Sequence, residues 1–529
     1  MSELPKKIET TPESVEQDTE DLHDFYTVEK DLQKLTVKNI RFRRLAIVER
    51  LKKMGYFSHK TGDNRTIVKV DENRISLSDD EDVITAFERF VLSLPDNVVS
   101  IQSKSDNDES DGTRNFTITP RYIQERLYDN LQSYFSKIYL NRLIPNEPIK
   151  ILKDSAHEKF IFFQNTAVSI SKSGIRPIPY KLLVDHIWES AIISRDFFYT
   201  KEKGDFETFT ERITGPGDRH RQFMSIIGYL VHDFYEIDLR AIFFTDANLQ
   251  EAGRAKGGTG KGLIGKAIAQ FLNRNPEDTT YIAIPGKGLD LHKDTKYSMA
   301  NINTQIIHIE DAEDGFDMKM LYNDITDGAK IRKIYQEPII KYVKMMVSLN
   351  HTLKMDRDSD RRRALIFELT NYYSSKHRPS SEFRWFFGHE WTEKDWNQFY
   401  SFMCRCVLLY MGNGLLEPSE INYTNRTLLE ALGAEFVVWF REKIQFYVDK
   451  ELECEFDKHV IFMEYAGKYD IDAGEKNRKK EKRIFTKKCQ DYCTIKSIPY
   501  CEIRSTNDLF IIYPSEANKT KARREQMDF

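Results

Sequence analysis

The chain has 529 residues, of which 40% are hydrophobic and 31% are charged, and its formal net charge is −4. That length is enough for about three or four domains, and the near-neutral charge excludes a polycation, so any nucleic-acid surface must be local. No apolar run approaches the roughly 20 residues that span a bilayer, and the acidic N-terminal stretch lacks the apolar segment of a signal peptide, so we expect a cytoplasmic protein without membrane association.

The first half of the chain predicts a mixed α+β region. Residues 1–24 are acidic and almost free of apolar side chains, which predicts disorder. We expect a small α+β module with an acidic linker over 25–115, and a mostly helical domain over 116–237. The individual predictions are helices over 28–57, 83–94, 120–143, 180–193 and 217–235, a hairpin over 66–76, and a strand–turn–strand over 160–170.

The pattern changes near residue 238. Apolar strands and helices alternate over 238–372, which is typical of a parallel sheet with helices on its faces. The range 373–450 is aromatic and predicts a helical extension. The range 451–529 predicts a small α+β region with a basic tail, for which a winged helix is one option. In that option the basic run 475–488 contacts DNA, and in the alternative it is a solvated helix.

A glycine-rich turn between an apolar strand and a helix predicts a phosphate-binding loop. Glycines permit left-handed turns and leave backbone N–H groups open to phosphate oxygens, and the helix N-terminus adds its dipole. Lys261 is placed to reach the β- and γ-phosphates of ATP. Ala255 replaces the usual first glycine, and Gly262 replaces the Ser or Thr whose hydroxyl binds Mg²⁺. The predicted nucleotide-binding residues are Gly257, Gly258, Thr259, Gly260, Lys261 and Gly262.

Two later apolar strands end in polar residues suited to ATP hydrolysis. The strand IIHIED ends in Glu310 and Asp311, and the strand KMMVSLN ends in Asn350. The carboxyl ends of parallel strands face the crevice where ligands bind. We expect Glu310 to hold Mg²⁺, Asp311 to orient or deprotonate the attacking water, and Asn350 to bond that water or the γ-phosphate. The alternatives are a solvated acidic loop and a turn asparagine.

Basic residues follow in two groups. In the cluster at 361–363, Arg361 or Arg362 is the candidate for a cation that stabilises the transition state in a neighbouring subunit. The segment 329–347 alternates like a β-hairpin, and its positive residues are candidate contacts to nucleic-acid phosphates. The alternatives are a solvated basic turn and an exposed, soluble hairpin. The hairpin residues are Lys330, Arg332, Lys333, Lys341 and Lys344.

The order of these features resembles that of the superfamily 3 helicases, a branch of the AAA+ ATPases. More narrowly, it is similar to the helicase part of the phage and plasmid primase-helicase family. The stretch ITDG at 325–328 and the aromatic segment 391–416 add to the resemblance. The expected fold is an α/β P-loop NTPase core of AAA+ type with a parallel sheet. An α+β N-terminal module and a helical plus small α+β C-terminal region are expected to flank that core.

The resemblance implies an ATP- and Mg²⁺-dependent DNA helicase that acts in replication of a phage or mobile element, in the host cytoplasm. It implies a homo-hexameric ring on single-stranded or forked DNA, with the hairpins lining the channel. A separate primase or other replication proteins would be its partners. Gly262 keeps open a second hypothesis, a replication scaffold or initiator that binds nucleotide and DNA but hydrolyses ATP poorly. A third is an AAA+ machine acting on protein, against which stimulation by single-stranded DNA would argue.

Overall fold

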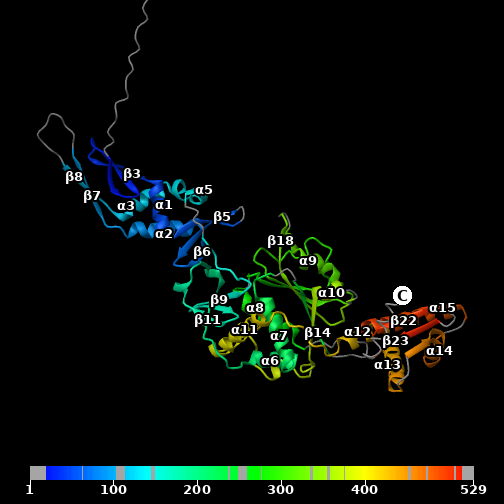
Figure 1. Ribbon diagram of the computed structural model, residues 1–529. Coiled ribbons are helices and arrows are strands. Elements are labelled where there is room, and N and C mark those ends of the chain that lie inside the picture. The colour runs from blue at the N-terminus through cyan, green and yellow to red at the C-terminus, as the bar shows by residue number, and fades with distance from the viewer. Residues whose placement is uncertain are drawn as a thin grey trace, which may run out of the picture. The chain divides into compact units, whose positions relative to one another are not determined.

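The computed structural model divides the chain into two compact units, each of which has its own core (Figure 1). The first unit comprises Met1–Leu152 with Ile178–Ile192, and the second comprises Lys153–Pro177 with Ile193–Phe529. In the described part of the chain, no helix is both long and apolar enough to cross a bilayer. The structure describes residues 19–61, 64–102, 113–143, 149–235, 239–247, 259–275, 277–333, 337–353, 355, 358–374, 376–450, 454–471, 475–504 and 508–514.

The first unit packs small sheets and helices around one aromatic core, in which Phe25, Tyr26, Phe87 and Phe135 are buried. Its sheets have the strand orders β1-β2-β3, β7-β8 and β12-β6-β5-β4. The strands are β1 (Thr19–His23), β2 (Tyr26–Asp31), β3 (Thr36–Phe42), β4 (Tyr56–Thr61), β5 (Asn64–Asp71), β6 (Arg74–Ser78), β7 (Asn97–Gln102), β8 (Thr113–Ile118) and β12 (Ile187–Trp188). The helices are α1 (Arg44–Lys53), α2 (Asp80–Leu92), α3 (Pro120–Tyr128), α4 (Leu131–Phe135) and α5 (Lys137–Leu143).

The helix predicted over 28–57 forms only in part, because strands β2, β3 and β4 occupy the rest of the segment together with turns. In β3, Ile40 and Phe42 are buried and Arg41 between them is exposed. This is the period of two of a strand, not the 3.6 of a helix, and only α1 is helical here. β1 also begins within the range 1–24 that we expected to be disordered, because its backbone pairs with β2. Residues 1–18 lie outside the described residues. The predicted hairpin (β5-β6) and the helix over 83–94 (α2) are confirmed.

Two further helix predictions need correction. The helix predicted over 120–143 is broken into α3, α4 and α5, because Asn130 (φ −138°) and Ser136 (ψ 145°) leave helical geometry. The segment 180–193 forms β12 and β13 (Ile192–Ile193) with short 3₁₀ turns, because its apolar pairs add to two sheets. The range 116–237 therefore contains more strand than expected. The strand pair β9 (Glu158–Phe163) and β10 (Ala167–Ser171) and the helix α7 (Asp218–Val231) are confirmed.

The second unit is built on a five-stranded parallel sheet of order β15-β16-β19-β14-β20. Every residue of β14 and β19 is buried, as expected for strands that are covered on both faces. The alternation predicted over 238–372 is confirmed, and α8 (Lys261–Leu272) follows β14. The strands are β14 (Ala241–Asp246), β15 (Tyr281–Pro285), β16 (Ile306–Ala312), β19 (Lys344–Leu349) and β20 (Ala364–Leu369).

A helical bundle shares the core of this sheet. α7 packs along α11 (Glu393–Asn413), and Gly228 of α7 permits the close approach, because a Cβ there would lie 2.2 Å from the carbonyl oxygen of Cys406. α6 (Asp205–Thr214) joins the bundle. β9 and β10 form a small sheet of order β11-β10-β9-β13 with β11 (Gly174–Ile178).

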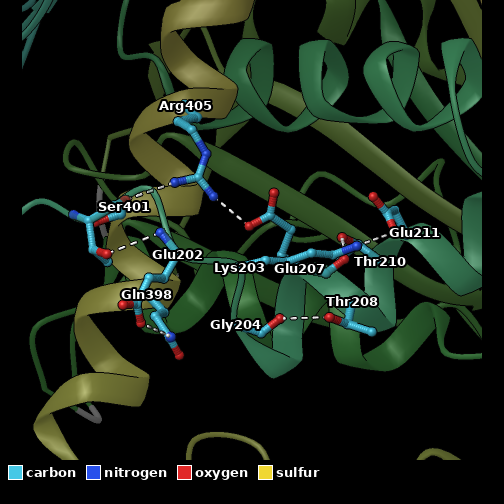
Figure 2. A network of polar contacts seen from close by, with 11 residues as sticks. Glu202, Lys203, Gly204, Glu207, Thr208, Thr210, Glu211, Gln398, Ser401 and Arg405 are labelled. Atoms are coloured by element: carbon cyan, nitrogen blue, oxygen red, sulfur yellow. Dashed lines mark hydrogen bonds and ion pairs between the residues drawn. The ribbon is translucent and has the colours of Figure 1, made fainter.

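A polar network fixes α6 against α11 (Figure 2). Arg405 of α11 forms an ion pair with Glu207 of α6 and donates to the carbonyl of Thr200 at 3.1 Å. The hydroxyl of Ser401 accepts from the backbone N–H of Thr200 at 3.0 Å. Burial raises the pKa of Glu207, and the Arg405 charge opposes this rise. The network holds α6 in place, and α6 carries the Phe209 ring that packs against the phosphate loop.

The end of the chain adds a helical hairpin and a small α+β module with its own aromatic core, which includes Phe436, Phe440 and Phe485. Its antiparallel sheet has the order β21-β23-β22. The described part of the range 451–529 contains both helices and strands, and the winged helix stays a prediction. The elements are α12 (Tyr423–Leu432), α13 (Ala434–Asp449), β21 (Cys454–Asp457), α14 (Lys458–Lys468), α15 (Glu475–Ile495), β22 (Tyr500–Arg504) and β23 (Asp508–Ile512).

Candidate nucleotide-binding site

Five of the residues predicted from sequence line one cavity at the carboxyl edge of the parallel sheet. The cavity has a volume of about 780 Å³ and opens beside the N-terminus of α8. This is the edge at which open α/β sheets bind ligands. Gly257 and Gly258 lie outside the described residues. The five predicted residues in the lining are Gly260, Lys261, Gly262, Asp311 and Asn350.

The described end of the predicted phosphate loop, Thr259 and Gly260, is fixed by packing and by a hydrogen bond. Gly260 caps α8 with φ 110°, and a Cβ at this position would lie 2.7 Å from the ring of Phe209. Both the left-handed backbone and the missing space require glycine. Thr259 is buried, and its hydroxyl donates a hydrogen bond to the Asp246 carboxylate at the end of β14. The loop therefore enters α8 in one defined conformation.

Lys261 lies between two acceptors at the sheet edge. Its Nζ is 2.6 Å from Oδ2 of Asp246 and donates to Oδ1 of Asn350 at 2.7 Å. Lys261 is 7% exposed, and burial lowers its pKa while the Asp246 carboxylate opposes that change. The structure thus brings Lys261 and Asn350, two of the predicted site residues, into contact. Asp246 was not predicted, because it is one acid at the end of an otherwise apolar strand.

Asp311 occupies a strained bulge at the mouth of the cavity. The pairing of β16 with β19 shifts register between Ile309 and Ala312, and Asp311 takes φ 50°. A left-handed conformation is unfavourable for a non-glycine residue, and such strain is concentrated at functional sites. The backbone N–H of Asp311 donates to the hydroxyl of Ser348 at 3.1 Å. This bond and the bulge hold Asp311 in the cavity lining.

Glu310, the predicted Mg²⁺ ligand, lies beside the cavity. Its side chain is half exposed and is not part of the described cavity lining. Burial raises the pKa of Glu310, the neighbouring Asp311 carboxylate adds to the rise, and Lys266 partly offsets it. His308 lies beneath, with Nδ1 3.6 Å from Oε1 of Glu310, and burial lowers its pKa to about 4. The histidine is therefore neutral at pH 7, and Lys266 is the cation that partly offsets the charge of Glu310.

A buried arginine from α12 connects two of the site strands. Arg426 is fully buried, and its Nη1 donates to the carbonyl of Asp246 and, at 3.1 Å, to the hydroxyl of Thr245. Its Nη2 lies 3.5 Å from the carbonyl of Asn350. Because Asp246 and Asn350 both contact Lys261, Arg426 fixes the main chain on both sides of that lysine. Sequence reasoning missed Arg426, since one arginine in a predicted helix is typical of a solvated face.

The predicted arginine finger is not brought to this cavity. Arg361 and Arg362 are exposed on α10 (Asp358–Arg363) and are not in the described lining. The side chain of Arg363 contacts residues of its own chain. Its Nε donates to the Thr326 hydroxyl at 3.2 Å, and its guanidinium lies 4.9 Å from the ring centre of Tyr322. This leaves the two predicted arginines as the exposed members of the cluster.

The predicted basic hairpin is confirmed as β17 (Ala329–Ile331) and β18 (Ile339–Lys341), which pair in antiparallel orientation. Residues 334–336 between them lie outside the described residues. Lys330 and Arg332 are about half exposed and form ion pairs with Asp294 at 3.3 and 2.9 Å. Lys333 is exposed, and Nζ of Lys341 lies 5.6 Å from the ring centre of Tyr235.

Lys344 was predicted to lie in the basic hairpin, and this prediction is wrong, because Lys344 is buried in β19. Its Nζ donates to the carbonyls of Tyr229 and His232 at the end of α7. A buried ammonium needs such acceptors, so Lys344 attaches the sheet to the bundle and cannot contact DNA.

The charges around the cavity fit a polyphosphate ligand. Lys266, Arg378 and Arg384 add cations to Lys261, and Asp311 supplies a carboxylate suited to a divalent metal ion. A Cβ at Gly262 would meet no atom within 4 Å, so a water molecule has room where the usual hydroxyl would bind Mg²⁺. The residues present therefore fit a nucleoside triphosphate with Mg²⁺. Arg378 and Arg384 were not predicted, because no motif surrounds them.

No protein-family model and no curated protein matches the chain. Among solved structures, the A form of the apo C-terminal region of NrS-1 (residues 305–718) matches 89% of this chain and 99% of its own, with 12% identity and a TM-score of 0.40. A second apo structure of that region gives 11% identity and a TM-score of 0.39, over 89% of this chain and 98% of its own. Drosophila ORC bound to DNA matches 63% of this chain and 96% of its own, with 12% identity and a TM-score of 0.17. At these scores the similarities establish neither fold nor function.

Proposed function

We propose that the second unit is an ATP-dependent motor that acts on DNA during replication of a phage or other mobile element. One observation carries this proposal: Lys261 bonds Asn350 in a cavity that Asp311 also lines. These residues come from three separate segments, and each is of the type that ATP hydrolysis requires at its position. The resemblance to superfamily 3 helicases supports the same conclusion.

Each residue at this edge has a role in the proposal. Lys261 and the N-terminus of α8 bind the phosphates. To do so, Lys261 gives up its bonds to Asp246 and Asn350 and forms bonds to phosphate oxygens instead. Asp311 orients or deprotonates the attacking water, and Asn350 bonds that water or the γ-phosphate. Mg²⁺ would neutralise charge on the phosphates, and Glu310 is the acid that would hold it.

The remaining roles require a second copy of the chain and DNA. Arg361 and Arg362 are exposed and outside the described cavity lining, which suits an arginine that acts on the nucleotide of a neighbouring subunit. A homo-hexameric ring supplies such a neighbour. In the ring the hairpin β17-β18 would face single-stranded or forked DNA and attract its phosphates without sequence preference. Primer synthesis would come from a separate primase.

ATP hydrolysis by the full chain, measured with and without single-stranded DNA, tests this proposal. We expect turnover that DNA stimulates, and we expect Lys261→Ala to abolish it, because the phosphate cation is removed. Lys172→Ala is the matched control, because Lys172 is an exposed lysine in a turn. DNA that leaves the turnover unchanged would contradict the motor.

A second candidate function is a replication scaffold that binds nucleotide and DNA without efficient hydrolysis. The observation that favours it is Gly262, which lacks the hydroxyl that usually binds Mg²⁺. Absence of turnover in a protein that still binds ATP and DNA would select this function over the motor.

A further inference from the structure

One wall of the cavity is formed by the segment after β20, and the aromatic residues of this wall have no role in the proposed chemistry. Its residues in the cavity lining include Arg378, Arg384, Trp385 and Phe386. Phe386 is buried, and its ring centre lies 5.3 Å from that of Phe209. The ring of Phe209 is also the one that packs against Gly260. The wall and the phosphate loop are therefore anchored on the same side chain.

Trp385 is exposed although it lies in this anchored wall. Its exposed fraction is 73%, and it lines the same cavity as Lys261. Its ring centre lies 6.0 Å from Nζ of Lys266, which is five residues after Lys261 and so about 7.5 Å further along α8. Single exposed apolar side chains are common on protein surfaces. Trp385 differs from such residues, because its indole ring lines the same cavity as Lys261, the predicted phosphate-binding lysine.

The segment next to Trp385 is held by contacts of the preceding residue. Arg384, the preceding residue, donates to Asp395 at 2.7 Å and to the carbonyl of Glu390 at 3.1 Å. Asp395 also completes the capping box of α11 with Thr392. The segment is thus tied to the start of a long helix, which reduces the cost of ordering the main chain at Trp385 when a ligand binds.

We infer that Trp385 is the platform on which the base of the bound nucleotide stacks. This inference rests on the proposed function, because it assigns the second half of the same ligand. A nucleoside triphosphate would place its phosphates at Lys261 and Gly262 and its base on the indole face. The cavity volume of about 780 Å³ lies within the range usual for sites of such ligands. Stacking on an aromatic ring tolerates every base, since each base has a π-face.

The affinities of the full chain for ATP and for inorganic tripolyphosphate, both with Mg²⁺, test the inference. Trp385→Ala should weaken ATP binding by about 5- to 100-fold, as expected for one stacked base, and should leave tripolyphosphate binding within about twofold. Trp385→Phe should retain most of the ATP affinity. Phe446→Ala, at an exposed aromatic on α13, should change neither affinity.

Two results would overturn the platform and leave the proposed function standing. One is wild-type ATP affinity in Trp385→Ala while Lys261→Ala weakens both ligands. The other is an equal loss of ATP and tripolyphosphate binding in Trp385→Ala, which would mean that the ring only shapes the wall. Failure of the wild-type chain to bind either ligand would instead overturn the proposed function, and the platform with it.

Discussion

Replacement of Arg426 by methionine should destabilise the second unit and its nucleotide site together. Arg426 is fully buried and donates to the carbonyl of Asp246 and the hydroxyl of Thr245, and its Nη2 lies 3.5 Å from the Asn350 carbonyl. Methionine retains most of the packing volume but leaves these acceptors without their donor. A hydrogen bond to a charged group contributes about 1.5–3 kcal/mol, so loss of the bonds to Asp246 and Thr245 should cost about 3–6 kcal/mol. At about 2 °C per kcal/mol for a large domain, the Tm should fall by about 6–12 °C.

Thermal unfolding of the full chain, with and without ATP and Mg²⁺, measures both effects. The rise in Tm that ATP produces should also shrink in Arg426→Met, because Arg426 holds the main chain of two residues that contact Lys261. Arg426→Lys should lie between wild type and Arg426→Met, since lysine keeps the charge but lacks the planar fork. Arg176→Met, at an exposed position in β11, is the control. A Tm within about 2 °C of wild type with unchanged ATP affinity would refute the reasoning.

Three further predictions concern hydrolysis and DNA binding. Gly262→Ser meets no steric barrier and should lower the Mg²⁺ concentration for half-maximal hydrolysis; an unchanged requirement would show that the missing hydroxyl does not limit the site. Replacement of Lys330, Arg332 and Lys333 by glutamine should make the plot of log binding constant against log salt concentration shallower by about 2 for single-stranded DNA. Hydrolysis without DNA should be retained. An unchanged slope would show that the hairpin does not contact DNA. The pKa of Glu310 is raised, so this acid takes up its proton at a higher pH than an ordinary glutamate. At limiting Mg²⁺ the rate of hydrolysis should therefore begin to fall at a higher pH than an ordinary glutamate would give. In Glu310→Gln the rate should no longer show this fall, because residue 310 no longer titrates.

The sheet and the strand-end residues could be predicted because both rest on local patterns. Apolar runs of strand length, separated by a glycine-rich turn and helices, specify the parallel sheet. Parallel strands bring their carboxyl ends to one edge, so Lys261, Asp311 and Asn350 meet although they lie far apart in the sequence. In the first unit the prediction of a helix over 28–57 is correct for α1 and wrong for β2 and β3, because basic residues between apolar ones fit a helix face and a strand face alike.

The contacts that complete the site could not be predicted, because they are made between distant segments without a motif. Asp246 and Arg426 are single charges whose burial depends on how α12 meets the sheet. Lys344 was assigned to the hairpin by its neighbours, but its partners are carbonyls at the end of α7. Trp385 lies in an irregular segment, where no helical or strand periodicity in the sequence indicates which side chains are exposed.

The central claim is that ATP hydrolysis at Lys261 drives movement on DNA, and strand displacement from a forked duplex tests it most directly. We predict that the wild-type chain with ATP and Mg²⁺ releases the strand, and that Lys261→Ala binds the fork without releasing it. A wild-type chain that binds the fork and ATP but releases no strand would contradict the motor and leave the scaffold.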